Sequence, residues 1–302
     1  MGIAIADYDR DGHVDVYVAN DSMPGFLYHN KGNGTFEEVA LLAGVGVTDS
    51  GRTYAGMGVD FADYNNDGLP DLAVADLALD TYALYENEGK GFFKYATDAT
   101  GLGNITMQHS GMGLHFIDYD NDGRKDLLVS QGHVMDTVDQ VNPNLHYREP
   151  ILLVRNTPQG FVDVSAASGE VFRQAWAGRG LAIGDINNDG RVDAVVSTSE
   201  GPAHVILNET VTPNHWLMLK LTGHKSNRDA IGAEVKVVIA RGAQYATVTT
   251  AGSYLSSSDK RVHFGLGLET TVQKVEIRWP SGILQTLRDV KADQILEVDE
   301  PR

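Results

Sequence analysis

The sequence contains no cysteine among its 302 residues. Disulfide frameworks, thiolate zinc sites and cysteine nucleophiles are therefore excluded. No apolar run approaches the roughly eighteen residues of a membrane-spanning helix, so we expect no membrane span. Basic residues are also few, at 24 against 41 acidic ones, giving a net charge of −17. An acidic protein repels nucleic acid and anionic lipid, so we expect neither as a partner.

What the sequence does contain is aspartate, crowded into short stretches. The stretch DYDRDGHVD, from Asp7 to Asp15, holds four aspartates around one glycine. Carboxylates this close repel one another and raise each other's pKa, and a bound cation relieves that repulsion. The crowding therefore predicts a metal site.

The same nine-residue pattern occurs four times, in loop 1 (residues 7–15), loop 2 (63–71), loop 3 (118–126) and loop 4 (185–193). Positions 1, 5 and 9 are always Asp, position 3 is Asp or Asn, and position 6 is always Gly. Position 7 can offer only its backbone carbonyl. The candidate ligands are Asp7, Asp9, Asp11, His13 and Asp15; Asp63, Asn65, Asp67, Leu69 and Asp71; Asp118, Asp120, Asp122, Arg124 and Asp126; and Asp185, Asn187, Asp189, Arg191 and Asp193.

An all-oxygen ligand set of this kind predicts Ca²⁺, which takes six to eight flexible oxygen ligands at about 2.3–2.6 Å. Mg²⁺ demands stricter octahedral geometry and keeps more of its water. The EF-hand is excluded because it needs a bidentate Glu at position 12, where all four loops have Val. Four ions, carrying eight positive charges, would bring the formal charge from −17 to −9.

The loops recur at separations of 56, 55 and 67 residues, which indicates a repeat architecture. Each unit reads as a short strand, the acidic loop, a second strand, and then an apolar strand with a Gly-rich turn and an aromatic return strand. On the second strands, pairs such as Val16 and Val18 or Leu72 and Val74 share one face, which we expect to be buried. Units of three or four antiparallel strands predict blades of a β-propeller.

The repeated pattern resembles the FG-GAP or VCBS repeats found in integrin α-subunit propellers and in many bacterial exported proteins. The resemblance covers residues 1 to about 210, and we take residues 1–212 as this repeat region. The six residues before the loops read MGIAIA, MGVDFA, MGLHFI and RGLAIG. The first residue is thus in register with the interior of the later units, and we expect a fragment whose upstream part carries further repeats and an export signal.

Residues 213–302 follow a different pattern, with the acidic loops replaced by strongly alternating strands. In KVEIRWP, Val275, Ile277 and Trp279 face one way while the charged residues face the other, as in half-buried antiparallel strands. The stretches NHWLMLKLTGHKSNRDAIGAEV, GSYLSSSDKRVHFGLG and VEIRWPSG resemble the ASPIC and UnbV domain. The expected fold is therefore all-β, a partial propeller followed by a small antiparallel β domain.

Signals for catalysis are weak in the sequence. There is no G-x-S-x-G and no P-loop, and the serines of the stretch GSYLSSSD at 252–259 are interpreted as solvated turn residues. Asp60 and His115 hold equivalent positions on strands expected to be innermost, so they are candidates to line the propeller axis. His109, His115, His133 and His146 lie in one blade and its excursion at residues 131–150. A transition-metal site that uses several of these histidines is an alternative to ordinary surface or packed histidines. The excursion itself is a candidate binding loop.

The favoured interpretation is an exported Ca²⁺-binding repeat protein that acts as an adhesion, binding or scaffolding module for a protein or glycan ligand. Its location would be extracellular, periplasmic or on the cell surface, where millimolar Ca²⁺ keeps weak sites filled. The alternatives are an enzyme, a hydrolase or isomerase, with its site on the propeller face or at the domain junction, and a structural spacer.

Overall fold

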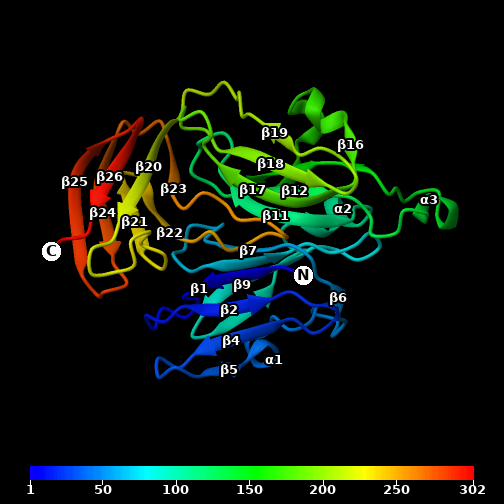
Figure 1. The fold of residues 1–302 in the computed structure, drawn as a ribbon, viewed down its shortest axis with the longest axis horizontal. Helices are drawn as coiled ribbons and strands as arrows, with labels where there is room; N and C mark the ends of the chain where they lie inside the picture. The colour runs from blue at the N-terminus through cyan, green and yellow to red at the C-terminus, as the bar shows by residue number, and fades with distance from the viewer.

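A computed structural model describes residues 1–302 and consists almost entirely of small β-sheets in two parts (Figure 1). Four antiparallel sheets, here called blades 1 to 4, stack face to face in the first part. Blade 1 contains β1 (Ile3–Ala6), β2 (Asp15–Val18), β4 (Phe26–Asn30) and β5 (Phe36–Glu38); blade 2 contains β7 (Val59–Ala62), β8 (Asp71–Val74), β9 (Ala83–Gly89) and β10 (Phe92–Tyr95). Blade 3 contains β11 (Gly111–Ile117), β12 (Asp126–Gln131), β14 (Leu152–Thr157) and β15 (Gly160–Asp163); blade 4 contains β17 (Gly178–Gly184), β18 (Asp193–Thr198) and β19 (His204–Ile206).

Short helical turns and two-stranded ladders lie between the strands of the blades. None of the helices has the length and apolar character needed to cross a bilayer. The helical turns are α1 (Ala40–Ala43), α2 (Leu102–Thr106), α3 (Val138–Val141), η1 (Ser165–Ala167) and η2 (Glu170–Arg173). The two-stranded ladders pair β3 (Asp21–Met23) with β6 (Tyr54–Ala55), and β13 (Glu149–Pro150) with β16 (Ala175–Trp176).

Each acidic loop is the turn of the hairpin between the first two strands of a blade. The strand register sets this, because the residue before position 1 pairs with the aspartate at position 9 in every blade. The pairs are Ala6 with Asp15, Ala62 with Asp71, Ile117 with Asp126, and Gly184 with Asp193. The four loops therefore occupy the same place in four similar sheets.

The hydrophobic core of the first part lies between blades rather than within them. Tyr17 and Leu27 of blade 1 pack against Leu72 and Val74 of blade 2, and similar clusters fill the next two interfaces. The expectation that Val16 and Val18 are buried is wrong for blade 1, where both are only half-buried. They face away from blade 2, on a side where no other blade packs.

The second part is a two-layer β-sandwich. One sheet has the order β23-β20-β26 and the other β22-β21-β24-β25. The bounds are β20 (His215–Thr222), β21 (Glu234–Ile239), β22 (Gly242–Thr247), β23 (Val262–Gly267), β24 (Thr271–Arg278), β25 (Leu284–Lys291) and β26 (Gln294–Asp299). As expected, Val275, Ile277 and Trp279 are buried in its core. The sandwich is not wholly antiparallel, since β26 lies parallel to β20.

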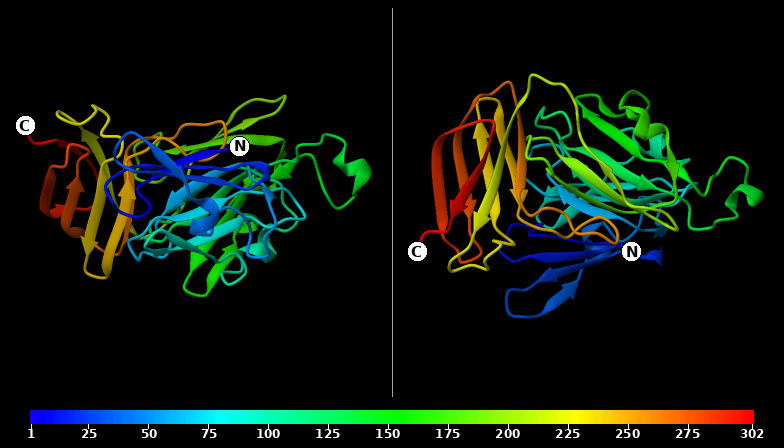
Figure 2. Two further views of the ribbon diagram at one scale, coloured as in Figure 1. Left: turned by 90° about the horizontal axis from the view of Figure 1, so that it is seen from below. Right: turned by 45° about the horizontal axis from the view of Figure 1, so that its top comes forward.

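One segment of the second part, residues 249–259, leaves the sandwich and runs among the first strands of the four blades (Figures 1 and 2). Ser253 forms a bridge with Val59 of β7, and Ser256 donates to the carbonyl of Leu181 in β17 at 2.6 Å. Gly2, just before β1, lies so close to the Ser253 carbonyl that a side chain there would overlap it. We call residues 249–259 the axial segment.

Candidate metal centres and the adjoining cavity

The four acidic loops share one backbone conformation. Position 4 is in the left-handed region in each loop, at φ 61° for Arg10, 60° for Asn66, 59° for Asn121 and 59° for Asn188. The glycine at position 6 also has a positive φ, between 84° and 97° in the four loops. A residue with a β-carbon is strained at the φ of position 6, which explains the glycine there.

The side-chain oxygens at positions 1, 3 and 5 point inward because each side chain accepts a hydrogen bond from the backbone of its own loop. In loop 1, Asp7 accepts from the amide of Gly12 at 2.8 Å, and Asp11 accepts from the amide of His13 at 2.8 Å. The Asp residues at positions 1 and 5 make equivalent bonds in loops 2, 3 and 4. These local hydrogen bonds therefore hold the turn without a contribution from an ion.

The aspartate at position 9 connects the loop to the third strand. Asp15 accepts from the amides of Tyr8 at 3.2 Å and Asn30 at 2.7 Å, and Asp71 accepts from Tyr64 and Asn87. Loops 3 and 4 repeat the pattern. All four of these aspartates are at most 1% exposed. Each oxygen retains a second lone pair, so this bonding leaves capacity for a cation.

Several oxygen atoms in the loops have no hydrogen-bond partner. The side-chain atoms are Asp7 Oδ1 and Asp118 Oδ1, both buried. The carbonyls at position 7, those of His13, Leu69, Arg124 and Arg191, accept no hydrogen bond either. Buried oxygens without a donor are costly unless a cation contacts them. In loops 1 and 3 the carboxylate oxygens of positions 1, 3 and 5 lie within 4.8 Å of one another. The donor set therefore fits a hard cation such as Ca²⁺.

Burial perturbs the acidity of these carboxylates. Desolvation raises the pKa of Asp15 to about 7, of Asp71 to about 8 and of Asp126 to about 9, against the lowering effect of their backbone hydrogen bonds. Burial likewise raises the pKa of Asp63 to about 6, with a further contribution from the neighbouring Asp67. A divalent cation would reverse this tendency, because it favours the charged form.

The loops differ in the side chain that precedes the Asn of the third strand, which is His29, Glu86, Arg155 or Leu207. His29 Nδ1 lies 3.4 Å from a carboxylate oxygen of Asp9 and of Asp15. Glu86 accepts a hydrogen bond from Asn65 at 3.3 Å. Arg155 places its guanidinium 2.6 Å from Asp120 in loop 3. Loop 2 thus has an additional carboxylate near its ligands, whereas loop 3 has a positive charge.

All four loops lie against the second part of the chain. At each position-6 glycine an added β-carbon would meet a sandwich side chain, namely Arg278 at loop 1, Tyr245 at loop 2, Arg241 and Gln244 at loop 3, and Trp216 at loop 4. Arg261 also donates to the carbonyl of Asp185 at 2.6 Å. The sandwich therefore covers the loop side of the blades.

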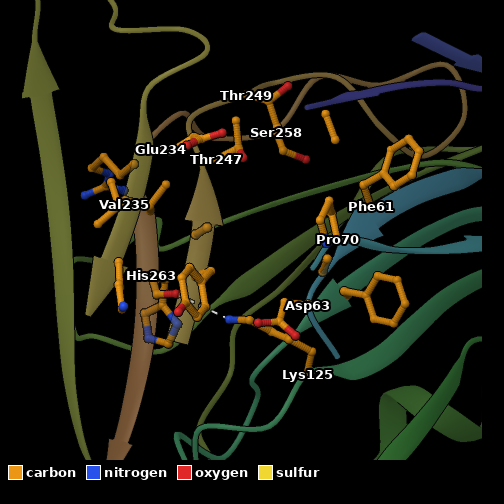
Figure 3. Close-up of a pocket in the computed structure, with 18 of the residues that line it drawn as sticks. Phe61, Asp63, Pro70, Lys125, Glu234, Val235, Thr247, Thr249, Ser258 and His263 are labelled. Carbon is orange, nitrogen blue, oxygen red and sulfur yellow. Dashed lines mark hydrogen bonds between the residues drawn. The ribbon is translucent and has the colours of Figure 1, made fainter. Parts of the chain in front are cut away.

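Between the loops and the sandwich lies a cavity of about 500 Å³. Figure 3 shows Asp63 and Lys125 from the blades on one side and Glu234 and Thr247 from the sandwich on the other. The Lys125 ammonium contacts the carbonyl of His263 at 3.5 Å across this space. The aspartates at position 1 of all four loops line the cavity, so ions bound there would border it.

Family models match both parts. The FG-GAP-like repeat model matches residues 7–74 and 63–129, which include loops 1 to 3, and the ASPIC and UnbV model matches residues 223–302. The chain carries FG-GAP-like repeats followed by an ASPIC and UnbV domain. Loops 1 to 3 are thus part of the matched repeats, and the ASPIC and UnbV match covers the sandwich from β21 onward.

The chain is homologous to cartilage acidic protein 1. It is 25% identical to the Xenopus tropicalis protein over 313 residues and 24% identical to the Homo sapiens protein over 314 residues. These alignments cover 99% and 100% of this chain, but only 45% and 44% of the relatives. The chain therefore spans less than half the length of these relatives.

Among solved structures, an Agrocybe aegerita lectin that recognises non-reducing terminal N-acetylglucosamine aligns with a TM-score of 0.37 and 18% identity, over 68% of this chain and 51% of the lectin. The V. cholerae biofilm matrix protein Bap1 aligns with a TM-score of 0.37 and 10% identity, over 95% and 48%. Scores this low carry no argument about function.

The histidines considered for a transition-metal site do not converge. His109 pairs with Glu149 at 3.1 Å, and His146 pairs with Asp139 at 2.7 Å in the exposed excursion that includes α3. His133 accepts from the amide of Met135. These three histidines therefore each contact a different partner and do not share one site. Asp60 and His115, by contrast, do meet at the inner strands, 3.0 Å apart.

Sequence reasoning missed the axial segment. Its serines were interpreted as turn residues, yet Ser258 lies 2.9 Å from His115, and it contacts blade 4 through Ile183. The separation of 143 residues between Ser258 and His115 explains the omission, since no local pattern links them. The only feature of the sequence that pointed to this place in the fold was that Asp60 and His115 occupy equivalent positions in the repeat.

Proposed function

We propose that this chain is part of an extracellular repeat protein in which each acidic loop binds one Ca²⁺ ion and the loaded blades support a binding site for a protein or glycan. Positions 1, 3, 5 and 9 would supply side-chain oxygens and position 7 its carbonyl. The ion would supply positive charge at the centre of each turn. The observation that carries the proposal is the set of inward carboxylates with unpartnered buried oxygens, notably Asp7 Oδ1 and Asp118 Oδ1.

An extracellular location is supported by the proposed ion, because extracellular Ca²⁺ modules typically bind in the range of about 10⁻⁴ to 10⁻³ M, which only millimolar Ca²⁺ fills. The lack of cysteine is compatible with that location. Similarity to cartilage acidic protein 1 agrees with this location. The binding role is supported by the cavity of about 500 Å³, a size that accepts small ligands or the end of a larger one.

Calcium would act on more than the individual hairpins. Because the sandwich contacts the loops of all four blades, an ordered loop also orders the surface on which the sandwich rests. Binding to the folded form alone stabilises the protein by about 2.7 kcal/mol per site when Ca²⁺ is a hundredfold above its Kd. Loss of the ions should therefore affect both the blades and the sandwich.

The test is isothermal titration of the EGTA-treated chain with Ca²⁺, together with thermal melts in EGTA and in Ca²⁺. We expect about four binding events and a higher Tm in Ca²⁺. Asp122→Ala should remove one event, whereas Asp49→Ala, an equal charge change at an exposed residue outside the loops, should retain all four. Equal melts in EGTA and Ca²⁺, with no heat of binding, would refute the metal role.

A further inference from the structure

Three side chains from distant parts of the chain form a continuous hydrogen-bonded series beside the cavity. Ser258 Oγ lies 2.9 Å from His115 Nε2, and His115 Nδ1 lies 3.0 Å from Asp60 Oδ2. Asp60 is on β7 of blade 2, His115 is on β11 of blade 3, and Ser258 belongs to the axial segment of the ASPIC and UnbV domain. All three line the cavity.

The hydrogen bonds around Asp60 determine the tautomer of His115. Asp60 Oδ2 also accepts from the amide of Phe116 at 3.0 Å, and Oδ1 accepts from the amide of Phe61 at 3.0 Å. A carboxylate with three such donors is an acceptor only, so the imidazole proton is on Nδ1. In the neutral imidazole Nε2 then carries no proton, and it can accept from the Ser258 hydroxyl 2.9 Å away.

Ser258 is held in position by a second contact. Its Oγ accepts from the amide of Ile183 at 3.1 Å, which fixes the hydroxyl relative to β17. A serine oxygen has two lone pairs, so one remains for attack on a substrate. The order of groups, hydroxyl to imidazole to buried carboxylate, matches the nucleophile, base and orienting group of serine hydrolases, which are recognised by geometry rather than by motif.

The three side chains also differ in how far they are buried. His115 is 3% exposed and Asp60 is 9% exposed, whereas Ser258 is half-buried at the cavity (Figure 3). Gly252 lies over the buried pair with a φ of 135°, and a β-carbon there would be 2.9 Å from Asp60 Oδ1 and 3.1 Å from His115 Cε1. The glycine thus lets the axial segment cover the imidazole and carboxylate while the hydroxyl reaches the cavity.

We propose that Ser258 is a nucleophile, His115 its general base and Asp60 the orienting carboxylate of an acyl-ester hydrolase site in this cavity. Ser258 Oγ would bond to the ester carbon as its proton passes to His115 Nε2. The carbon–oxygen bond to the alcohol then breaks, and the alcohol leaves with that proton. Water then attacks the acyl carbon and gives one proton to Nε2, the bond between that carbon and Ser258 Oγ breaks, and Oγ takes the proton back. The sum is ester plus water to acid plus alcohol, without redox change.

The experiment uses a fluorophosphonate probe, which phosphonylates activated serines, and p-nitrophenyl butyrate as a generic ester. The chain in Ca²⁺ buffer should gain one probe mass at Ser258 and release p-nitrophenolate. Ser258→Ala should lose both. Ser256→Ala, in the same segment but bonded to the Leu181 carbonyl, should retain both. Asp60→Asn should slow labelling by about 10²- to 10⁴-fold, the typical contribution of acid–base catalysis.

Two outcomes would overturn the proposal. One is a wild-type chain that is neither labelled nor active, even though Ser258→Ala lowers the Tm; Ser258 would then only hold the axial segment in place. The other is labelling that persists in Ser258→Ala. Melting curves for every variant distinguish lost chemistry from lost folding, and the calcium titration above is independent of both results.

Discussion

The side-chain amide of Asn87 in blade 2 donates to the backbone carbonyl of Tyr8 in loop 1 at 2.9 Å. The same bond recurs along the stack, from Asn156 to the carbonyl of Tyr64 and from Asn208 to that of Tyr119. Each acidic loop of blades 1 to 3 is thus held by the blade that follows it. Asn30, the equivalent residue of blade 1, bonds only within its own blade, to Val14.

The first prediction isolates this bond between blades. Asn87→Ala removes the donor from the Tyr8 carbonyl and leaves that acceptor unsatisfied, so we expect a loss of about 1–3 kcal/mol in the free energy of unfolding. Asn30→Ala is the matched control, because both residues also accept from a glycine two positions later. Urea denaturation of the two variants should show the larger loss for Asn87→Ala. Equal losses would count against the bond.

A second prediction concerns the contact between loop 4 and the sandwich. Gly190 has a φ of 84°, and a β-carbon on it would overlap the Trp216 ring. Gly34 has nearly the same φ, 85°, but open space around it. Both substitutions to Ala incur similar backbone strain, so the excess cost of Gly190→Ala reports overpacking, about 1–3 kcal/mol. Thermal melts measure it, and limited proteolysis should show faster cleavage between blade 4 and the sandwich. Indistinguishable variants would contradict this contact.

A third prediction concerns the differences between loops. Arg155 lies beside the ligands of loop 3, so Arg155→Leu should tighten one Ca²⁺ site by about tenfold, or ~1.4 kcal/mol, by removing a like charge. Leu already occupies this position in blade 4. Arg155→Lys keeps the charge and should leave the affinity near that of the wild type. Isothermal titration gives the affinities, and an unchanged Kd in Arg155→Leu would mean that Arg155 does not compete with the ion.

The fourth prediction is the pH dependence of the calcium-free protein. An ordinary aspartate loses its proton near pH 4, whereas burial raises the pKa of Asp71 to about 8 and of Asp126 to about 9. Between pH 4 and 9 the folded state therefore retains protons that the unfolded state has lost, and these groups stabilise the fold less as the pH rises.

In EGTA, then, the Tm should fall between pH 5 and pH 8. Ca²⁺ replaces the protons, so the increase in Tm on adding Ca²⁺ should be larger at pH 8 than at pH 5. Differential scanning calorimetry at the two pH values measures both effects. A calcium effect of the same size at both would show that these carboxylates do not exchange protons for the ion.

The repeat and the type of sheet could be read from the sequence because their signals are local. Nine residues of each loop contain the turn glycine and the aspartates, and two-residue alternation marks the adjoining strands. The incomplete burial of Val16 could not be predicted from these local patterns. Its pattern equals that of Leu72, and only the neighbouring blade decides which of the two is buried.

The cavity and its side chains depend on contacts across long stretches of chain. The repeat predicts that Asp60 and His115 line the propeller axis, but their contact at 3.0 Å depends on how blades 2 and 3 pack and could not be predicted. Ser258 is in a different domain, within a serine-rich stretch that resembles any polar turn. Likewise, nothing in loop 4 indicates that Trp216 covers Gly190.

The axial segment has a consequence for the order in which the protein matures. Ribosomes make the blades first, but the residues that join their inner strands, such as Ser253 and Ser258, are made 47 and 52 residues after the last blade strand ends at Ile206 (253 − 206 and 258 − 206). A nascent chain must therefore keep four blades together without the axial segment until the ASPIC and UnbV domain has emerged.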